Sequence, residues 1–207
     1  MSYKIFGGQK MYQIKRMFTR HIEENIVKYV LLLSIFAVGI ATGLFFSQNV
    51  SEDLSENLTQ EIEVLLEGFS EGNTDNLVIL KTSFLKNLRI CFLLFVSGLS
   101  AFLLPVTFFT IISYGFSIGF TTGYLSFCFG GTGLAVSIVS VVFSFIINIP
   151  MYICLSVLAI NSCKCKKHKG ENLTSYIIVF LFLFLVSLIS VVVDAFITPW
   201  LIGLICS

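Results

Sequence analysis

The sequence predicts an all-α fold: a polytopic membrane helix bundle with five transmembrane helices, a cytoplasmic N-terminus and an extracytoplasmic C-terminus. Composition is the first observation behind this prediction, because 56% of the 207 residues are apolar, only 12% are charged, and the mean hydropathy is +0.93. A soluble domain of this size needs more charged side chains to cover its surface. The second observation is the length of the apolar runs, and the third is the clustering of charges between them. The net charge of +1 also argues against a nucleic-acid partner.

Residues 27–46 form the first expected span. These twenty residues rise about 30 Å as an α-helix, which matches the hydrocarbon thickness of a bilayer. The run is longer than a signal-peptide core and no small-residue cleavage site follows it, so we expect an uncleaved anchor. Residues 1–26 carry basic and apolar side chains at helical spacing, which predicts a cytoplasmic amphipathic helix held on anionic lipid.

Residues 90–160 are expected to hold spans two to four. Breaks are predicted at 113–115 (Ser-Tyr-Gly) and at 130–133 (Gly-Gly-Thr-Gly), because such stretches commonly interrupt helices. With three crossings here, the basic N-terminus and the four lysines of residues 161–175 share one side of the membrane, as the positive-inside rule requires. Residues 176–207 then hold the fifth span and lead the C-terminus outside.

Residues 47–89 form an acidic extracytoplasmic segment that holds eight of the twelve acidic residues. Apolar residues recur at helical spacing in its first half, which predicts a helix with one apolar stripe: Leu54, Leu58, Ile62, Leu66 and Phe69. The stripe either packs on the protein's own bundle or a second copy, or it docks a partner protein. A second helix is expected to start near Thr74 or Asp75 and to run through Lys81 and Lys86 into span two.

Glycine spacing predicts which helices pack closely. Gly115, Gly119 and Gly123 lie four residues apart on one helix face, and Gly39 and Gly43 repeat the spacing in span one. Small residues at this spacing let two helix backbones approach each other. We expect these faces to pack within the chain, and self-association through one of them is the alternative.

Polar residues at membrane depth are few. Asn148 lies two residues before Pro150, and Asp194 lies five residues before Pro199. Asp194 follows Tyr176 by eighteen residues, or about 27 Å of helical rise, which places its carboxylate near the outer interface. We expect a structural role, in which Asp194 caps a helix break or pairs with a basic residue: Lys81, Lys86 or Arg89. The alternative is an ion or proton relay through Asn148 and Asp194 in a small transporter or lipid-handling protein.

The sequence predicts no enzyme, cofactor or metal. Residues 115–119 match the G-x-S-x-G motif of serine hydrolases, but Ser117 lies in an apolar helix instead of a strand-to-helix turn, and both histidines fall in cytoplasmic segments. Cys163, Cys165 and His168 supply three ligands among four lysines, whereas a structural zinc site uses four ligands. Such juxtamembrane cysteines are either palmitoylated or reduced thiols.

Motifs in the spans, in their order and spacing, resemble the stage II sporulation protein M family over nearly the whole chain. They are Lys86-Asn87-Leu88-Arg89, Leu103-Leu104-Pro105-Val106, the stretch from Tyr114 to Gly123, Ile149-Pro150, and the stretch from Asp194 to Pro199. The wider family often has a polar, sometimes ionisable residue before the span-four proline, and this chain has Asn148 there. The family's acid in span five is here Asp194.

The resemblance implies a role in endospore-forming bacteria during engulfment of the forespore. Family members anchor stage II sporulation proteins D and P, which degrade peptidoglycan, at the septal membrane. The implied localisation is the bacterial cell membrane, specifically the septal or engulfing membrane of the mother cell. The implied partners are these hydrolases together with membrane lipids, and a homo-oligomer stays open.

Overall fold

The structure is a computed structural model that describes residues 3–70, 76–164 and 171–206. Helices account for nearly all of these residues, so the predicted all-α class is confirmed. The elements are α1 (Tyr3–Ser47), α2 (Glu52–Ser70), α3 (Asn76–Leu99), the short 3₁₀ turn η1 (Ala101–Leu103), α4 (Leu104–Lys164) and α5 (Glu171–Cys206). The second helix of the acidic segment, α3, runs through Lys81 and Lys86 as predicted.

Helix α4 folds back on itself at Gly130. The backbone there has φ 56° and ψ −129°, a conformation that glycine adopts readily and L side chains do not. Gly133 then packs against the backbone of Leu125, so the chain has reversed within a few residues. The predicted break at 130–133 is therefore confirmed. We call residues 104–129 the first arm of α4 and residues 131–164 its second arm.

The other predicted break was wrong. Residues 113–115 lie inside the first arm of α4, and the turn between α3 and α4 lies at residues 100–103 instead. Ser100 has an extended backbone, with φ −144° and ψ 138°. Pro105 then lies in the first turn of α4. Backbone N–H groups in a first turn have no acceptor within the helix, so proline costs no helical hydrogen bond there. Gly115 needs no turn because its missing side chain makes room for α1.

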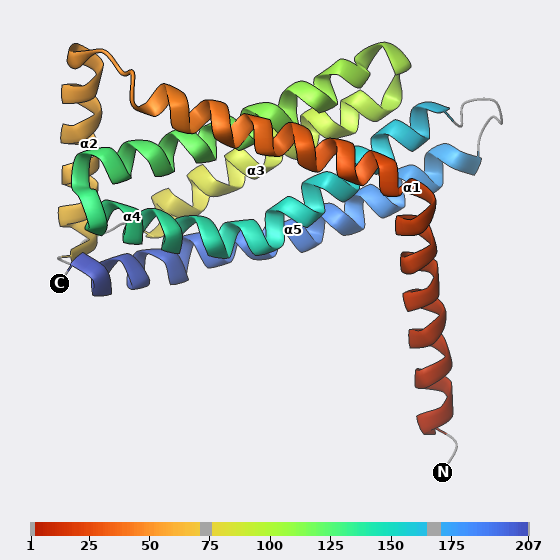
Figure 1. Cartoon of the computed structure of the whole chain (residues 1–207). Coiled ribbons are helices and arrows are strands. Elements are labelled where there is room, and N and C mark those ends of the chain that lie inside the picture. The colour runs from red at the N-terminus through yellow and green to blue at the C-terminus, as the bar shows by residue number, and fades with distance from the viewer. Residues whose placement is uncertain (1–2, 71–75, 165–170, 207) are drawn as a thin grey trace.

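The bundle-forming part of α1, α3, both arms of α4 and α5 lie side by side and alternate in direction (Figure 1). Helix α2 lies across one end of this bundle, where α1 ends and α3 begins. The end of α4 and the start of α5 lie at the opposite end, where the N-terminal part of α1 projects away from the bundle. The apolar core joins α1, α3, α4 and α5 through residues such as Leu32, Leu94, Leu155 and Leu183.

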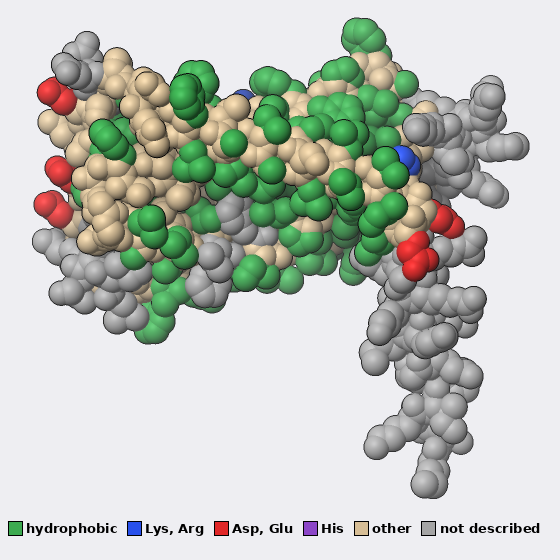
Figure 2. Space-filling view, viewed as in Figure 1, with side chains coloured by type: hydrophobic (Ala, Val, Ile, Leu, Met, Phe, Trp, Pro, Cys, Tyr) green, Lys and Arg blue, Asp and Glu red, His purple; other side chains and the backbone are tan. Residues whose placement is uncertain are grey.

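Many large apolar side chains are exposed on the outer surface of the bundle. Figure 2 shows hydrophobic side chains over the visible face of the bundle, and large side chains such as Val27 and Trp200 are exposed to more than half of their area. Among the described residues, four helical stretches are long and apolar enough to cross a membrane: Ile22–Ser47, Ala101–Val141, Ile146–Cys163 and Tyr176–Gly203. Helix α3 is not among them, so the fifth span and the orientation of the termini stay predictions.

A topology map tests that prediction. We expect a single cysteine at position 166 to react only from the cytoplasmic side and one at position 61 only from outside, because α2 lies at one end of the bundle and the end of α4, which precedes position 166 in the chain, lies at the other. Membrane-impermeant thiol labelling of intact cells, in a background without the native cysteines, measures this. Labelling of both positions from one side would contradict five spans.

Candidate functional site

Glycine contacts between α1 and α4 set the position of the first arm of α4. A Cβ atom on Gly39 would lie 2.5 Å from the carbonyl oxygen of Ile112, and one on Gly115 would lie 2.5 Å from that of Phe36. Added Cβ atoms on Gly43 and Gly119 would likewise overlap backbone atoms of the facing helix, and one on Gly123 would overlap the Ser47 side chain. The two glycine faces thus cover each other within one chain.

Asn87 is the centre of a buried polar cluster between α3, α4 and α5. Its side chain is 3% exposed. The amide nitrogen donates to the backbone oxygen of Ser187 at 3.0 Å and to its hydroxyl at 3.2 Å. The amide oxygen accepts from the hydroxyl of Tyr152 at 3.0 Å. One side chain therefore joins three helices. Its amide nitrogen and oxygen both have hydrogen-bond partners, as polar groups buried in an apolar bundle require.

Asn148 lies one helical turn before Tyr152 and extends this cluster. Its Oδ1 accepts from the hydroxyl of Ser190 at 2.7 Å, and that hydroxyl also lies 2.9 Å from the backbone oxygen of Ser187. Asn148 is buried, at 5% exposure. The predicted intramembrane Asn148 is thus a helix-to-helix contact between the second arm of α4 and α5.

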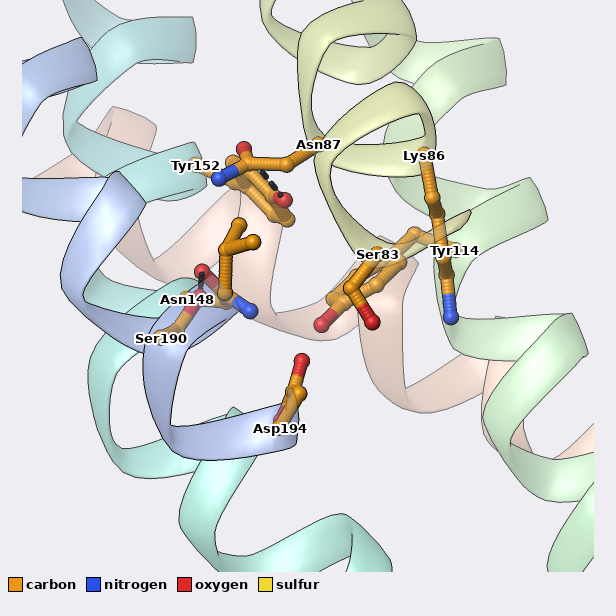
Figure 3. A pocket seen from close by; sticks show the side chains of 9 residues that line it. Ser83, Lys86, Asn87, Tyr114, Asn148, Tyr152, Ser190 and Asp194 are labelled. Carbon is orange, nitrogen blue, oxygen red and sulfur yellow. Dashed lines mark hydrogen bonds between the residues drawn. The ribbon is translucent and has the colours of Figure 1, made fainter. Parts of the chain in front are cut away.

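A small cavity of about 50 Å³ opens beside the cluster and brings Asn148 and Asp194 together. Figure 3 shows the polar side chains around it: Ser83, Lys86, Asn87, Tyr114, Asn148, Tyr152, Ser190 and Asp194. Asp194 enters from α5 and Lys86 from α3. Since one buried water needs about 10 to 15 Å³ by this measure, the cavity has room for a few waters and is small for an organic solute.

The expected helix break beyond Asp194 is absent from the described part of α5. The helix continues through Pro199 to Cys206, so Asp194 caps no break there. Pro150 likewise lies inside the second arm of α4. Transmembrane helices tolerate proline because neighbouring helices and side chains satisfy the freed backbone groups. The shared cavity instead places Asp194 near Lys86, one of its three predicted basic partners.

The apolar stripe of α2 faces the end of the bundle where its side chains are described. Leu58 and Ile62 are half-buried, and α2 contacts α5. The hydroxyls of Ser55 and Thr59 lie 3.1 and 3.0 Å from the hydroxyl of Tyr124. The side chains of Leu54, Leu66 and Phe69 lie outside the described residues. These contacts fit packing of the stripe on the protein's own bundle.

The opposite face of α2 is exposed and acidic. Glu56, Gln60, Glu63 and Glu67 recur at spacings of four, three and four residues, so they share one helix face, and all four are exposed. Acidic side chains appear along this end of the molecule in Figure 2. We call these four residues the acidic face of α2.

Helix α3 carries two basic residues near its middle. Lys86 and Arg89 are exposed on α3 and line an open groove beside the first arm of α4. A lysine or arginine at the centre of a bilayer costs about 2.5 to 3.5 kcal/mol on insertion scales. With α3 as the predicted fifth crossing, Lys86 and Arg89 are therefore candidates for binding a negative partner.

The remaining sequence candidates show no assembled reaction site in the described residues. Ser117 lies in the regular helix of the first α4 arm. Cys163 is buried, with its sulfur 3.4 Å from the backbone oxygens of Ser97 and Gly98. Cys165 and His168 lie outside the described residues. Where the chain is described, no group of three or more metal-ligating side chains occurs.

Sequence reasoning missed most members of the polar cluster. Asn87 was singled out only within a family motif, and Tyr152, Ser187 and Ser190 were not singled out at all. Helical spacing was the signal that could have identified them. Asn148 and Tyr152 are four residues apart, and Ser187 and Ser190 are three residues apart. Each pair thus marks one helix face that carries polar groups inside an apolar run.

Replacing Asn87 should destabilise the bundle. The variant Asn87→Leu removes the acceptor of the Tyr152 hydroxyl and should lower the free energy of unfolding by about 1 to 3 kcal/mol. Thermal unfolding of the detergent-purified protein measures this loss. Ser34→Ala is the control, because this exposed hydroxyl donates to the carbonyl of Val30 on its own helix. Equal melting of both variants and the wild type would show that the cluster contributes nothing.

Comparison with known proteins supplies the family. No curated protein and no solved structure matches the chain. The sequence model of the family described as stage II sporulation protein M matches residues 32–199, from the middle of α1 to near the end of α5. This range includes the glycine contact, the polar cluster and the acidic face of α2. Because the match covers most of the chain, the protein belongs to the stage II sporulation protein M family.

Proposed function

We propose that the protein is a non-enzymatic membrane scaffold that anchors peptidoglycan-degrading proteins during engulfment. These partners would resemble stage II sporulation proteins D and P, and the site would be the septal or engulfing membrane of the mother cell. Family membership supports a sporulation-related membrane role. The anchoring role is our extension of it.

The acidic face of α2 is the observation that carries this proposal. It is an exposed helix surface at one end of the bundle, held there by the contacts of Ser55 and Thr59 with Tyr124. In the five-span topology this end lies outside the cytoplasm, on the side where peptidoglycan is degraded. A row of carboxylates favours a basic protein surface and repels anionic wall polymers.

The interior of the bundle supports a structural body. Asn87, Asn148, Tyr152, Ser187 and Ser190 bond to one another across three helices. Satisfied polar networks of this kind fix helix positions. A rigid bundle with close glycine contacts would hold α2 in a constant orientation above the membrane.

Crosslinking during sporulation tests the proposal. Cells that carry an affinity-tagged chain should yield a peptidoglycan hydrolase as a crosslinked partner, and cells without the chain should stall at engulfment while vegetative growth stays normal. The same purification from vegetative cells is the control. Normal engulfment without the chain would contradict the proposal.

A small transporter or lipid-handling protein is the second candidate, because Asn148 and Asp194 line one cavity. Its small volume favours a hydrated structural pocket over a solute path. Proton or solute flux into vesicles that contain the purified protein, lost in Asp194→Asn, would support transport. Equal flux in both proteins would exclude a transport role for this carboxylate.

A further inference from the structure

An open groove of about 430 Å³ runs between α3 and the first arm of α4. Its lining falls entirely within the described residues and contains no carboxylate. The polar lining consists of two cations and four hydroxyls: Lys86, Arg89, Thr110, Ser113, Tyr114 and Ser117. Lys86, Arg89, Ser113 and Ser117 are exposed, so these groups are accessible from outside the bundle. We call this surface the basic groove.

The two cations lie far from both ends of α3. Arg89 precedes the end at Leu99 by ten residues, and Lys86 follows the start at Asn76 by ten residues, about 15 Å of rise in each case. Both line the groove with residues 110–117, near the middle of the first arm of α4, which lies inside a stretch apolar enough to cross a membrane. With α3 as the second span, in place of a span that begins at residue 90, both therefore lie within the hydrocarbon, where an exposed charge is costly without a partner of opposite sign. A lipid phosphate resides at the interface, whereas a carboxylate on a transmembrane helix can lie at this depth.

The α4 side of the basic groove suits a second helix. Ser113 and Ser117 are one turn apart, and exposed Thr121 follows one turn later. This row is offset by two residues from Gly115 and Gly119, or about 200° around the helix, so it lies opposite the face that packs on α1. Small residues spaced by four let a neighbouring helix approach closely.

We propose that the basic groove binds a transmembrane helix of another membrane protein through an aspartate or glutamate carboxylate inside the bilayer. Arg89 forms the ion pair, and the serine hydroxyls donate to the remaining carboxylate oxygen lone pairs. Lys86, which also lines the cavity that holds Asp194, adds a second positive charge beside Arg89. The low dielectric around the pair strengthens the attraction and sets the depth of the partner helix. This inference rests on the proposed scaffold function and its topology, and it adds the chemistry of an intramembrane contact.

Reconstitution with a synthetic helix tests the proposal. The full-length chain is placed in phosphatidylcholine vesicles with a labelled helix of about 20 apolar residues that carries one central aspartate. Energy transfer should show at least tenfold tighter association than for the same helix with asparagine. The variant Lys86→Gln with Arg89→Gln should lower aspartate-helix binding to the asparagine level. Lys81→Gln is the matched control, because Lys81 lies on α3 outside the basic groove and should leave binding unchanged.

Charge reversal keeps the test decisive if the double variant folds poorly. Arg89→Asp should bind a helix with a central lysine better than the wild type does. Equal binding of the aspartate and asparagine helices to the wild type would overturn the proposal. Displacement of the aspartate helix by vesicle phosphatidylglycerol would also overturn it and identify a lipid headgroup site. The vesicles hold no sporulation protein, so either failure leaves the hydrolase-anchoring proposal to its own test.

Discussion

Gly119→Ala is expected to lower membrane accumulation of the protein several-fold. A Cβ atom at position 119 would overlap the backbone carbonyl of Ile40, and backbone on both helices must move to relieve the overlap. Overpacking of this kind costs about 1 to 3 kcal/mol, and a loss of that size shifts cellular abundance several-fold. Immunoblots of membrane fractions and thermal unfolding in detergent measure the effect.

Gly131→Ala is the matched control for this substitution. An added Cβ atom at position 131 meets no atom within 4 Å. The residue begins the second arm of α4, and alanine favours helices more than glycine does. Its stability should therefore equal or exceed that of the wild type. If Gly119→Ala accumulates and melts like Gly131→Ala, the close contact between α1 and α4 is not required.

Neutralising the acidic face of α2 should reduce hydrolase recovery at least tenfold, or about 1.4 kcal/mol of binding free energy. The variant combines Glu56→Gln, Glu63→Gln and Glu67→Gln, which keeps side-chain size on exposed positions. Glutamine is preferable to lysine, because added positive charge outside would act against the positive-inside rule. Quantitative crosslinked recovery from sporulating cells at equal membrane levels measures the loss.

A second triple variant controls for net charge. It combines Glu61→Gln, on another side of α2, with Glu23→Gln and Glu24→Gln, which lie in α1 more than twenty residues before its end at Ser47. This variant also loses three negative charges, but none of them belongs to the acidic face of α2. Recovery of the crosslinked hydrolase should therefore equal that of the wild type. Equal recovery from both triple variants and the wild type would place docking elsewhere, with the basic groove as the next surface to test.

Local patterns predicted the features whose cause is local. The spacing of Gly39 and Gly43 against Gly115 and Gly119 marks faces that can touch, and the structure brings these faces together. Gly130 turns the chain because its own backbone requires glycine. Helix α2 and the half-buried positions of Leu58 and Ile62 on it similarly follow from helical period alone.

Contacts between residues far apart in the chain could not be predicted from local sequence patterns. Asn87 pairs with Ser187 across one hundred residues and with Tyr152 across sixty-five, and no local spacing encodes either contact. The break at 113–115 was predicted from residue types common in turns, yet Gly115 is a packing residue against Phe36. The same residue type, glycine, serves both in turns and in close helix packing. Which of the two applies depends on whether another helix faces it.

Hydrolase localisation tests the central claim, membrane anchoring, most directly. A fluorescent fusion of the crosslinked hydrolase should concentrate at the septal membrane in sporulating cells that express the wild-type chain. It should spread along the whole cell membrane in cells without the chain, and also in cells with the triple variant of the acidic face at normal level. The control triple variant should restore septal enrichment. Undiminished septal enrichment in cells that lack the chain would contradict the scaffold function.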